Sequence, residues 1–267
     1  MSKYIFHVDT FTSTPFRGNA VAVCVLDAAC DHRWMLEIAI ALNMPEVAFL
    51  VPRGPNRFDL RCMTSRAEVE PGSPAALAAA HVLFSKRWAD PGRSISFFTH
   101  AGQIIASIDG KMIELNFPAL RLTEVLNPPA ELEQALERKF QYVGRRGDDF
   151  LVLLSSESTL KRVHPDYGLL RKTGVRGLIA TAPAGPDRAY DFAMRTFYAL
   201  PSLEGDDPLA SSANSALGPF WLPRLGKSRM SGYRYSKWGG IINLQVDGDR
   251  VKFTGEAITI LEGELKV

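Results

Sequence analysis

The stretch Gly72-Ser73-Pro74-Ala75-Ala76-Leu77-Ala78-Ala79-Ala80-His81-Val82-Leu83 decides the fold of this chain. Alanine and leucine are strong helix formers, so we predict a helix over residues 74–86. Most of its side chains are single methyl groups, which lets a helix pack closely inside a layer of β-sheet. Gly72-Ser73 marks the start of this helix.

Short apolar runs with turn residues between them surround this helix and predict β-strands. A further helix is expected at 32–42, with Asp31 as its N-cap. Asp109-Gly110 is typical of a tight hairpin between the last two strands of the first half. The strands predicted in this half are residues 4–8, 20–26, 47–51, 58–63, 95–99, 102–108 and 111–117.

The second half repeats this order of elements after residues 118–140, which we interpret as a linker leading into a short helix. A second helix rich in small residues is predicted at 212–222, and Asp247-Gly248 again indicates a hairpin. The other elements predicted here are strands at 142–143, 150–154, 178–182, 190–196, 239–246, 250–254 and 257–261 and a helix at 167–173.

Short matches support a duplication. Phe58-Asp59-Leu60 matches Tyr190-Asp191-Phe192, and Gly72-Ser73-Pro74-Ala75 matches Ser211-Ser212-Ala213-Asn214. The same order of strand, acidic loop, small-residue helix and meander occurs twice. We therefore predict an α+β protein of two pseudo-symmetric lobes, each a central helix wrapped by a mostly antiparallel curved sheet, with a cleft between them. The first lobe would comprise residues 1–118, completed by the last strand at about 257–267, and the second residues 119–256.

Composition narrows the classes of function. The 267 residues carry a net charge of only +2, unlike the basic footprint of a nucleic-acid binder. No apolar run approaches the length of a membrane span, so we expect no membrane partner. The three cysteines (Cys24, Cys30 and Cys62) form no disulfide framework or metal motif, which favours a reduced, cytoplasmic protein. The five histidines lack the spacing of metal ligands, so no metal is expected.

The starts of the two small-residue helices are candidate binding sites for an anion. A helix N-terminus presents unpaired N–H groups and a partial positive charge, both of which attract a carboxylate. Gly72 and Ser73 lie at one start, and Ser211 and Ser212 lie at the other. In the alternative interpretation, the serines are ordinary N-caps and the helices belong only to the core.

Two acidic residues are candidates for chemistry. Glu46 precedes the apolar strand 47–51, so it is either the exposed first residue of a strand or a carboxylate partly buried by apolar neighbours. Burial would raise its pKa towards that of a useful general acid or base. Asp207 precedes Pro208 near the second small-residue helix, where it either forms a turn or places a carboxylate at the mouth of the cleft.

Four motifs resemble, in the same order, those of the PhzF phenazine-biosynthesis-like family. The opening motif runs from Val8-Asp9-Thr10-Phe11 to Gly18-Asn19-Ala20-Val21, and Asn43-Met44-Pro45-Glu46-Val47-Ala48-Phe49 resembles the segment that holds the family's catalytic glutamate. Residues 68–83 resemble its Cys-Gly-His-Ala-Thr helix start, and residues 206–213 resemble its Glu-Asp-Pro-x-Thr-Gly-Ser-Ala segment. The ending, residues 253–265, is also similar to the family's last strands.

This resemblance implies a diaminopimelate epimerase-like fold, usually dimeric, and isomerisation of an unsaturated cyclic amino acid without a metal or organic cofactor. Glu46 matches the family glutamate that moves the proton, and Asp207 and Ser212 match residues that line the same site. Asn19, Gly72, Ser73 and Ser211 complete the predicted substrate-binding set.

The sequence also departs from the family. Ser73 stands in place of the family histidine, and Ala75 stands in place of the following threonine. The cysteine pair of epimerases with the related fold is absent, since Pro71 occupies the first position and residues 210–212 contain no cysteine. Racemisation by two thiols is therefore not expected.

Our leading hypothesis is a cofactor-independent isomerase that shifts a proton or double bond in a small unsaturated amino or carboxylic acid, in secondary-metabolite (antibiotic) biosynthesis. Glu46 would carry the proton, with Asp207 assisting, and a homodimer is expected. The alternative is a catalytically inactive homologue that binds small acids. A hydrolase that uses Ser73 or Ser212 as nucleophile lacks a convincing base partner.

Overall fold

The computed structural model describes residues 3–199, 205–206, 211–235 and 240–266. The chain forms two compact units. One consists of Met1–Pro118 with Lys252–Val267, and the other of Ala119–Val251. Each unit is α+β, with a mixed, mainly antiparallel sheet and few helices. Residues 252–256, which we expected in the second lobe, belong to the first unit because β17 pairs with β8.

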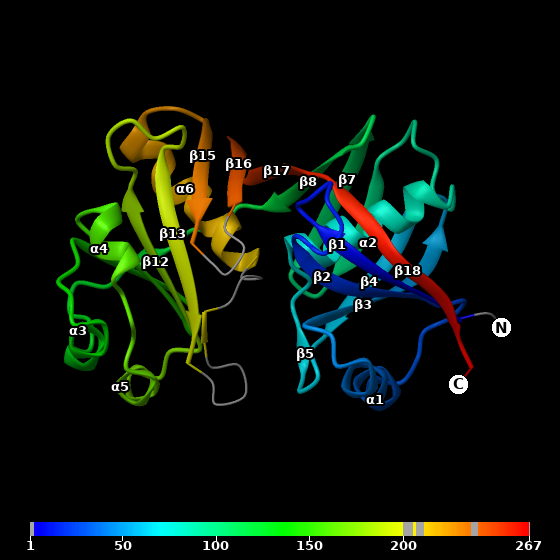
Figure 1. Cartoon of the computed structure of the whole chain (residues 1–267), viewed down its shortest axis with the longest axis horizontal. Coiled ribbons are helices and arrows are strands. Elements are labelled where there is room, and N and C mark those ends of the chain that lie inside the picture. Colours follow the sequence, from blue (N-terminus) through cyan, green and yellow to red (C-terminus); the bar gives the residue numbers. More distant parts are fainter. Residues whose placement is uncertain (1–2, 200–204, 207–210, 236–239, 267) are drawn as a thin grey trace. The chain divides into compact units, whose positions relative to one another are not determined.

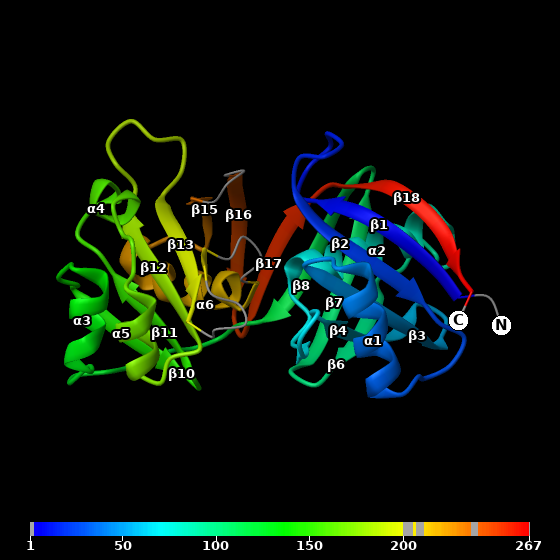
Figure 2. The ribbon, with the colours of Figure 1, turned by 60° about the horizontal axis from the view of Figure 1, so that its bottom comes forward.

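The first unit begins with β1 and ends with β18, which pair along their length (Figure 2). Its elements are β1 (Lys3–Thr10), β2 (Asn19–Val25), α1 (His32–Leu42), β3 (Glu46–Gly54), β4 (Arg57–Met63), β5 (Glu68–Val69), α2 (Ser73–Ser85), β6 (Ile95–Thr99), β7 (Gly102–Asp109), β8 (Met112–Pro118), β17 (Arg250–Gly255) and β18 (Ala257–Leu265). Asp31 caps α1, as predicted, by accepting a hydrogen bond from the Arg33 N–H at 3.4 Å.

Helix α2 is the core of the first unit. Apart from His81 and Ser85, all its residues are buried, and it packs against β1, β2, β3, β7, β8 and β18 (Figure 1). Its many alanines make this close packing possible, because a helix covered by strands on several sides has room only for small side chains at most positions. His81 projects to β18, where its Nε2 lies 3.0 Å from the Thr259 hydroxyl.

Successive residues of β3 face opposite sides of the sheet. Val47 and Phe49 pack with Met35, Ile38 and Ala39 of α1. Glu46, Ala48 and Leu50 therefore face the other side, where α2 lies. The parallel register of β2 with β3 and the antiparallel register of β3 with β4 extend this face to Val21 and Cys62.

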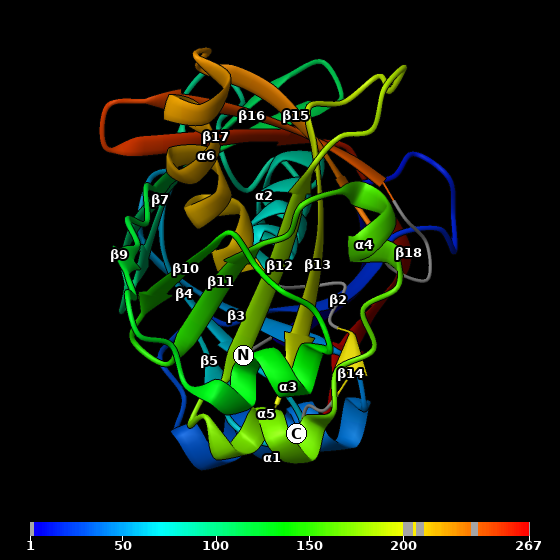
Figure 3. The ribbon, with the colours of Figure 1, turned by 90° about the vertical axis from the view of Figure 1, so that its left-hand side faces the viewer.

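The second unit repeats the order of strands found in the first. In the first unit, β2 is parallel to β3 and β4 is parallel to β6. In the second unit, β11 is parallel to β12 and β13 is parallel to β15. Figure 3 shows β10 to β13 side by side. The elements are β9 (Thr123–Glu124), α3 (Ala130–Leu136), β10 (Tyr142–Arg146), β11 (Asp149–Leu153), α4 (Glu157–Lys161), α5 (Tyr167–Lys172), β12 (Gly177–Pro183), β13 (Phe192–Tyr198), β14 (Gly205–Asp206), α6 (Ser211–Leu225), β15 (Arg229–Arg234) and β16 (Gly240–Asp247).

The sequence prediction missed β15 and began β13 two residues too early. The buried positions of β15 are Met230, Gly232 and Arg234, so the strand shows no apolar alternation in the sequence. Gly232 is required because a Cβ there would lie 2.4 Å from the ring of Phe192. The last strand, expected at about 257–267 to complete the first lobe, is β18, which pairs with β1 in the first unit. The strand predicted at 190–196 is β13, which begins two residues further on.

Candidate functional site

Glu46 is the first residue of β3, and its side chain is buried, with the residue only 7% exposed. The prediction of an exposed strand end is therefore wrong, and that of a carboxylate enclosed by its neighbours is correct. Glu46 pairs with Val21 across the parallel ladder and faces α2. A buried carboxylate at the end of a sheet has limited contact with water, which suits a group that exchanges a proton with a bound molecule.

Asn19 lies at the same end of the sheet, because β2 and β3 are parallel and start together. It is buried, and its backbone carbonyl accepts a hydrogen bond from the Thr10 hydroxyl at 3.0 Å. Gly18 makes this turn possible, since it has a φ of +153° and a Cβ there would lie 2.5 Å from the Thr10 carbonyl. Asn19 lies two residues before Val21, so it shares the face of Glu46.

The start of α2 lies at this end too. The parallel strands β4 and β6 are connected through α2, so the helix must run back from the end of β4 to the start of β6. Antiparallel β3 begins with Glu46 where β4 ends. The structure thus brings Glu46, Asn19, Gly72 and Ser73 to one end of one sheet, on the side of α2.

Gly72 is the N-cap of α2 and makes no side-chain capping bond, so the interpretation of Ser73 as an ordinary N-cap is wrong. Ser73 is only 2% exposed and begins the helix. By the sequence resemblance, Ser73 is the residue that stands in place of the family histidine. His81 cannot replace that histidine, because it lies about two turns further along α2 and contacts β18. Burial lowers the pKa of His81, so its ring is neutral at neutral pH.

Cys62 is a neighbour of Glu46 that the sequence prediction overlooked. It is fully buried and pairs with Ala48, on the face of Glu46. Burial raises the pKa of the Cys62 thiol well above its usual value, and the charges of Glu46 and Glu68 raise it further. Cys62 therefore remains a protonated thiol at neutral pH and is a poor nucleophile.

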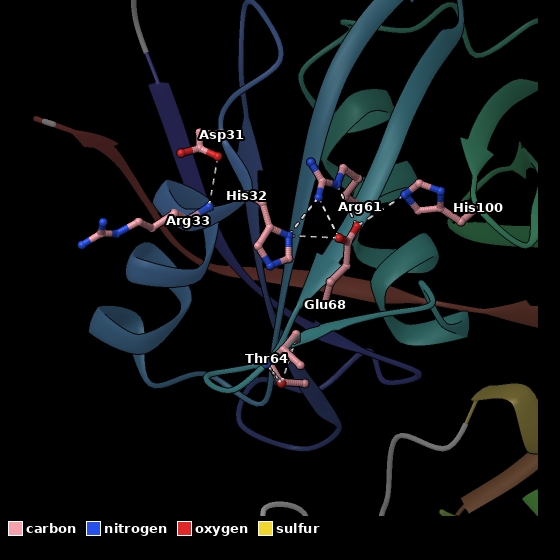
Figure 4. A network of polar contacts seen from close by, with 8 residues as sticks. Asp31, His32, Arg33, Arg61, Thr64, Glu68 and His100 are labelled. Atoms are coloured by element: carbon pink, nitrogen blue, oxygen red, sulfur yellow. Dashed lines mark hydrogen bonds and ion pairs between the residues drawn. The ribbon is translucent and has the colours of Figure 1, made fainter. Parts of the chain in front are cut away.

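A network of polar contacts around the Arg61–Glu68 ion pair lies just before α2 (Figure 4). The Nε and Nη2 atoms of Arg61 each donate to the Glu68 carboxylate at 2.7 Å. His32 Nδ1 and His100 Nε2 lie 3.2 Å and 3.8 Å from the same carboxylate. Hydrogen bonds from Arg61 hold the pKa of Glu68 below its usual value. Arg61 follows Arg57 and Asp59 at every second position of β4, as on an ordinary polar face of a strand, so the sequence does not single it out.

The candidate residues of the second unit are only partly described. Ser211 and Ser212 begin α6, as predicted, but their side chains lie outside the described part of the structure. Asp207 also lies outside the described residues. In the ranges that the structure covers, no three His, Cys, Asp or Glu side chains cluster as metal ligands. Within the same ranges, no helix is both long and apolar enough to cross a membrane.

Comparison with known proteins defines the class to which this chain belongs. The family described as "Phenazine biosynthesis-like protein" matches residues 8–263. The chain is 37% identical over 265 residues to an uncharacterised isomerase of Halalkalibacterium halodurans, covering 99% of each. Its fold matches the crystal structure of a PhzF family protein from Enterococcus faecalis, with a TM-score of 0.86, 30% identity and full coverage of both chains.

The chain therefore belongs to the phenazine biosynthesis-like family. A hydroxyproline epimerase from Agrobacterium vitis, with bound trans-4-hydroxy-L-proline, has the same fold, with a TM-score of 0.60 at 13% identity, covering 99% of this chain and 91% of that one. The predicted diaminopimelate epimerase-like, two-lobed fold is confirmed. Family membership supports an isomerase that acts on small acids as the general class of enzyme.

Proposed function

We propose that this protein is a cofactor-independent isomerase that shifts a proton, and with it a double bond, in a small unsaturated amino or carboxylic acid. The observation that carries the proposal is the burial of Glu46 at the start of β3, facing α2. The names of its relatives agree with an isomerase. A buried carboxylate next to a helix start offers both a base for a C–H proton and a binding position for an anion.

In this mechanism Glu46 takes a proton from one carbon of the substrate and returns it to another carbon on the same face. General acid–base catalysis of this kind contributes about 10²–10⁴-fold to the rate. The N–H groups at Gly72 and Ser73 would bind the substrate carboxylate, and Asn19 would add a polar contact. Asp207, Ser211 and Ser212 are proposed to contribute as the sequence resemblance predicts.

Because position 73 is a serine and not a histidine, the proposed chemistry depends on a single acidic residue, Glu46. A serine hydroxyl does not titrate near neutral pH, unlike the histidine that the family carries at this position. Ser73 could donate or accept a hydrogen bond, but it could not hold the substrate proton as a histidine can. Glu46 would then serve as both the base and the acid of the reaction.

Three further aspects remain part of the proposal. We propose a role in secondary-metabolite biosynthesis, a small anionic substrate, and a cytoplasmic homodimer that uses no nucleic acid, membrane or cofactor. Neighbouring biosynthetic genes would support the pathway role. Sedimentation of the purified protein at several concentrations would test the dimer.

The replacement of the family histidine by Ser73 also favours a second candidate, a protein that binds small acids without turning them over. The two candidates differ in one measurable property. An isomerase moves a double bond in its substrate and so forms a product with a different NMR spectrum, whereas a binding protein leaves the compound unchanged.

The experiment is incubation with a panel of unsaturated cyclic amino acids in D₂O, followed by proton NMR. We expect wild-type protein to convert one of them into an isomer, with deuterium at the new C–H position to the extent that Glu46 exchanges its proton with solvent, and Glu46→Gln to slow this conversion by about 10²–10⁴-fold while leaving the fold intact. Glu37→Gln makes the same chemical change on the exposed face of α1 and serves as the control. Near-wild-type turnover by Glu46→Gln would contradict the assignment, and binding without conversion would favour the second candidate.

A further inference from the structure

The segment from Glu68 to Gly72 connects the end of the sheet to the first turn of α2. It contains the two-residue strand β5, then Glu70 and Pro71, and ends at the N-cap. Gly72 has no side chain with which to cap the helix, so the positions of its first peptide groups depend on this segment. The contacts that hold the segment therefore determine where those N–H groups point.

Arg61 makes the strongest of these contacts. Its guanidinium donates two hydrogen bonds of 2.7 Å to the Glu68 carboxylate. Such two-point, charge-assisted pairs fix the relative orientation of both groups as well as their distance. Arg61 belongs to β4 and lies on the face of the sheet opposite to Cys62 and α2, so it cannot itself line the face that carries Glu46.

Two histidines hold the same carboxylate from other directions (Figure 4). His32 begins α1, and its Nδ1 lies 3.2 Å from Glu68 Oε2. His100, in the turn between β6 and β7, lies 3.8 Å from Glu68 Oε1. The next residue of that turn, Ala101, donates its backbone N–H to Glu70 at 3.2 Å. The segment is thus attached to β4, to α1 and to the β6–β7 turn.

The rest of α2 is too closely packed to adjust if the segment moves. Its residues from Ala75 to Ala80 have no measurable exposure, so the helix body cannot shift without displacing the surrounding strands. The part of the helix start that precedes this packed run, from Gly72 to Pro74, is where a change in the segment acts. A change at Glu68 should therefore alter the positions of the Gly72 and Ser73 peptide groups and leave the helix in place.

We propose that Arg61 and Glu68 are positioning residues that orient the start of α2 for binding of the substrate carboxylate. This inference rests on the proposed function, in which that carboxylate binds at Gly72 and Ser73. Neither residue would touch the substrate. Their loss should weaken substrate binding more than it slows the chemical step at Glu46, because the two ends of the substrate are held separately.

The test compares Glu68→Gln, Arg61→Met and Arg61→Lys with a matched control, Asp149→Asn. Asp149 forms a similar two-point pair with Arg176 in the second unit, and the side chains of Glu68 and Asp149 are 23% and 19% exposed. The measurements are kcat and KM, by NMR in D₂O with the substrate found in the screen, and hydrogen–deuterium exchange of peptides that cover residues 68–78.

For Glu68→Gln and Arg61→Met we expect KM to rise about tenfold, equivalent to about 1.4 kcal/mol of binding, with kcat within about threefold of wild type. Arg61→Lys keeps the charge but loses the two-point geometry, so its KM should lie between those of wild type and Arg61→Met. Amide exchange of residues 68–78 should accelerate in the first two variants. Asp149→Asn should change neither KM nor this exchange.

A merely structural role predicts a different result. Partial unfolding lowers the amount of active protein, so it reduces kcat and leaves KM unchanged, and that pattern would overturn the inference. Unchanged exchange in residues 68–78 would also overturn it. If wild-type protein moves no proton in any compound, the proposed function fails and the role in substrate binding fails with it. The amide exchange of residues 68–78 would then still show whether the network orders the start of α2.

Discussion

Each unit contains a corresponding pair of parallel strands, β2 with β3 in the first and β11 with β12 in the second, and the two pairs begin with different residues. In the first, the parallel ladder of β2 and β3 begins with Val21 opposite Glu46, and in the second, the ladder of β11 and β12 begins with Asp149 opposite Gly177. A Cβ on Gly177 would lie 2.9 Å from the Asp149 carboxylate, which also pairs with Arg176. The same strand order thus carries a buried acid in one unit and a glycine beside an ion pair in the other.

This difference shows that duplication of a fold does not duplicate its chemistry. Strand order depends on apolar patterning and turns, which tolerate many residues at the end of a strand. A carboxylate at such an end is costly to bury and is not required for folding. The proposed mechanism needs one acid that acts as both base and acid, and the asymmetry between Glu46 and Gly177 agrees with that requirement.

The largest effect should come from moving the acid of the first unit. Glu46→Asp keeps the charge but withdraws the carboxylate by about one bond length, and misplacement of about 1 Å can cost roughly 10²-fold in rate. Gly177→Ala changes the start of the corresponding parallel ladder in the second unit, where the added Cβ would displace the Asp149 carboxylate. We expect it to retain activity within about twofold. Equal losses in the two variants, measured as the rate of product formation by NMR, would contradict the functional asymmetry.

A second test concerns Glu157, a buried carboxylate of the second unit that we interpret as structural. It accepts hydrogen bonds from the Gly185 N–H at 2.8 Å and the Tyr190 hydroxyl at 2.7 Å, and another from Tyr235. Lys161 and Arg188 add ion pairs at 3.4 Å and 3.3 Å. Glu157→Gln should cost about 3 kcal/mol of the free energy of unfolding at pH 7, by loss of bonds to a charged group. KM should not change.

The pH dependence of this loss has a definite sign. Burial acts to raise the pKa of Glu157, but hydrogen bonds from Tyr235, Tyr190, Gly185 and Lys161 outweigh it and lower the pKa to about 2. The ordinary value is about 4.3. The folded pKa is depressed, so the stabilisation is complete above about pH 5 and declines as the pH falls towards 2. Denaturant unfolding at pH 6 and pH 3 should show the difference between wild type and Glu157→Gln narrowing at the lower pH.

The smallest effect is expected from the packing of the central helix. Ala79 is fully buried in α2, so Ala79→Leu should destabilise the protein by about 2 kcal/mol through overpacking. Ala130→Leu, on an exposed residue of α3, should change stability by less than about 0.5 kcal/mol. Denaturant unfolding measures both. Equal stabilities would show that α2 is packed less tightly than its lack of exposure indicates.

Much of this protein could be predicted from its sequence, but unevenly between the halves. The helix at 74–86, the strand after Glu46 and the hairpin at Asp109-Gly110 follow from strong local signals, and the structure contains all three. β15 was missed because Gly232 and Arg234 occupy buried positions that apolar residues usually fill. The last strand, β18, was expected to complete the first lobe, but its pairing with β1, about 250 residues away in the chain, leaves no local signal in the sequence.

The sequence by itself determined the fold family, the duplicated order of elements and Glu46 as the candidate acid, because these depend on local patterns and motif order. Only the tertiary structure decided that Glu46 is buried and faces α2, that Gly72 rather than Ser73 caps that helix, and that Arg61, Glu68, His32 and His100 form one network. The physical reason is that burial and ion pairing depend on which strands become neighbours. Residues brought together by parallel pairing and by a crossover helix are far apart in the chain, and their spacing in the sequence carries no record of the contact.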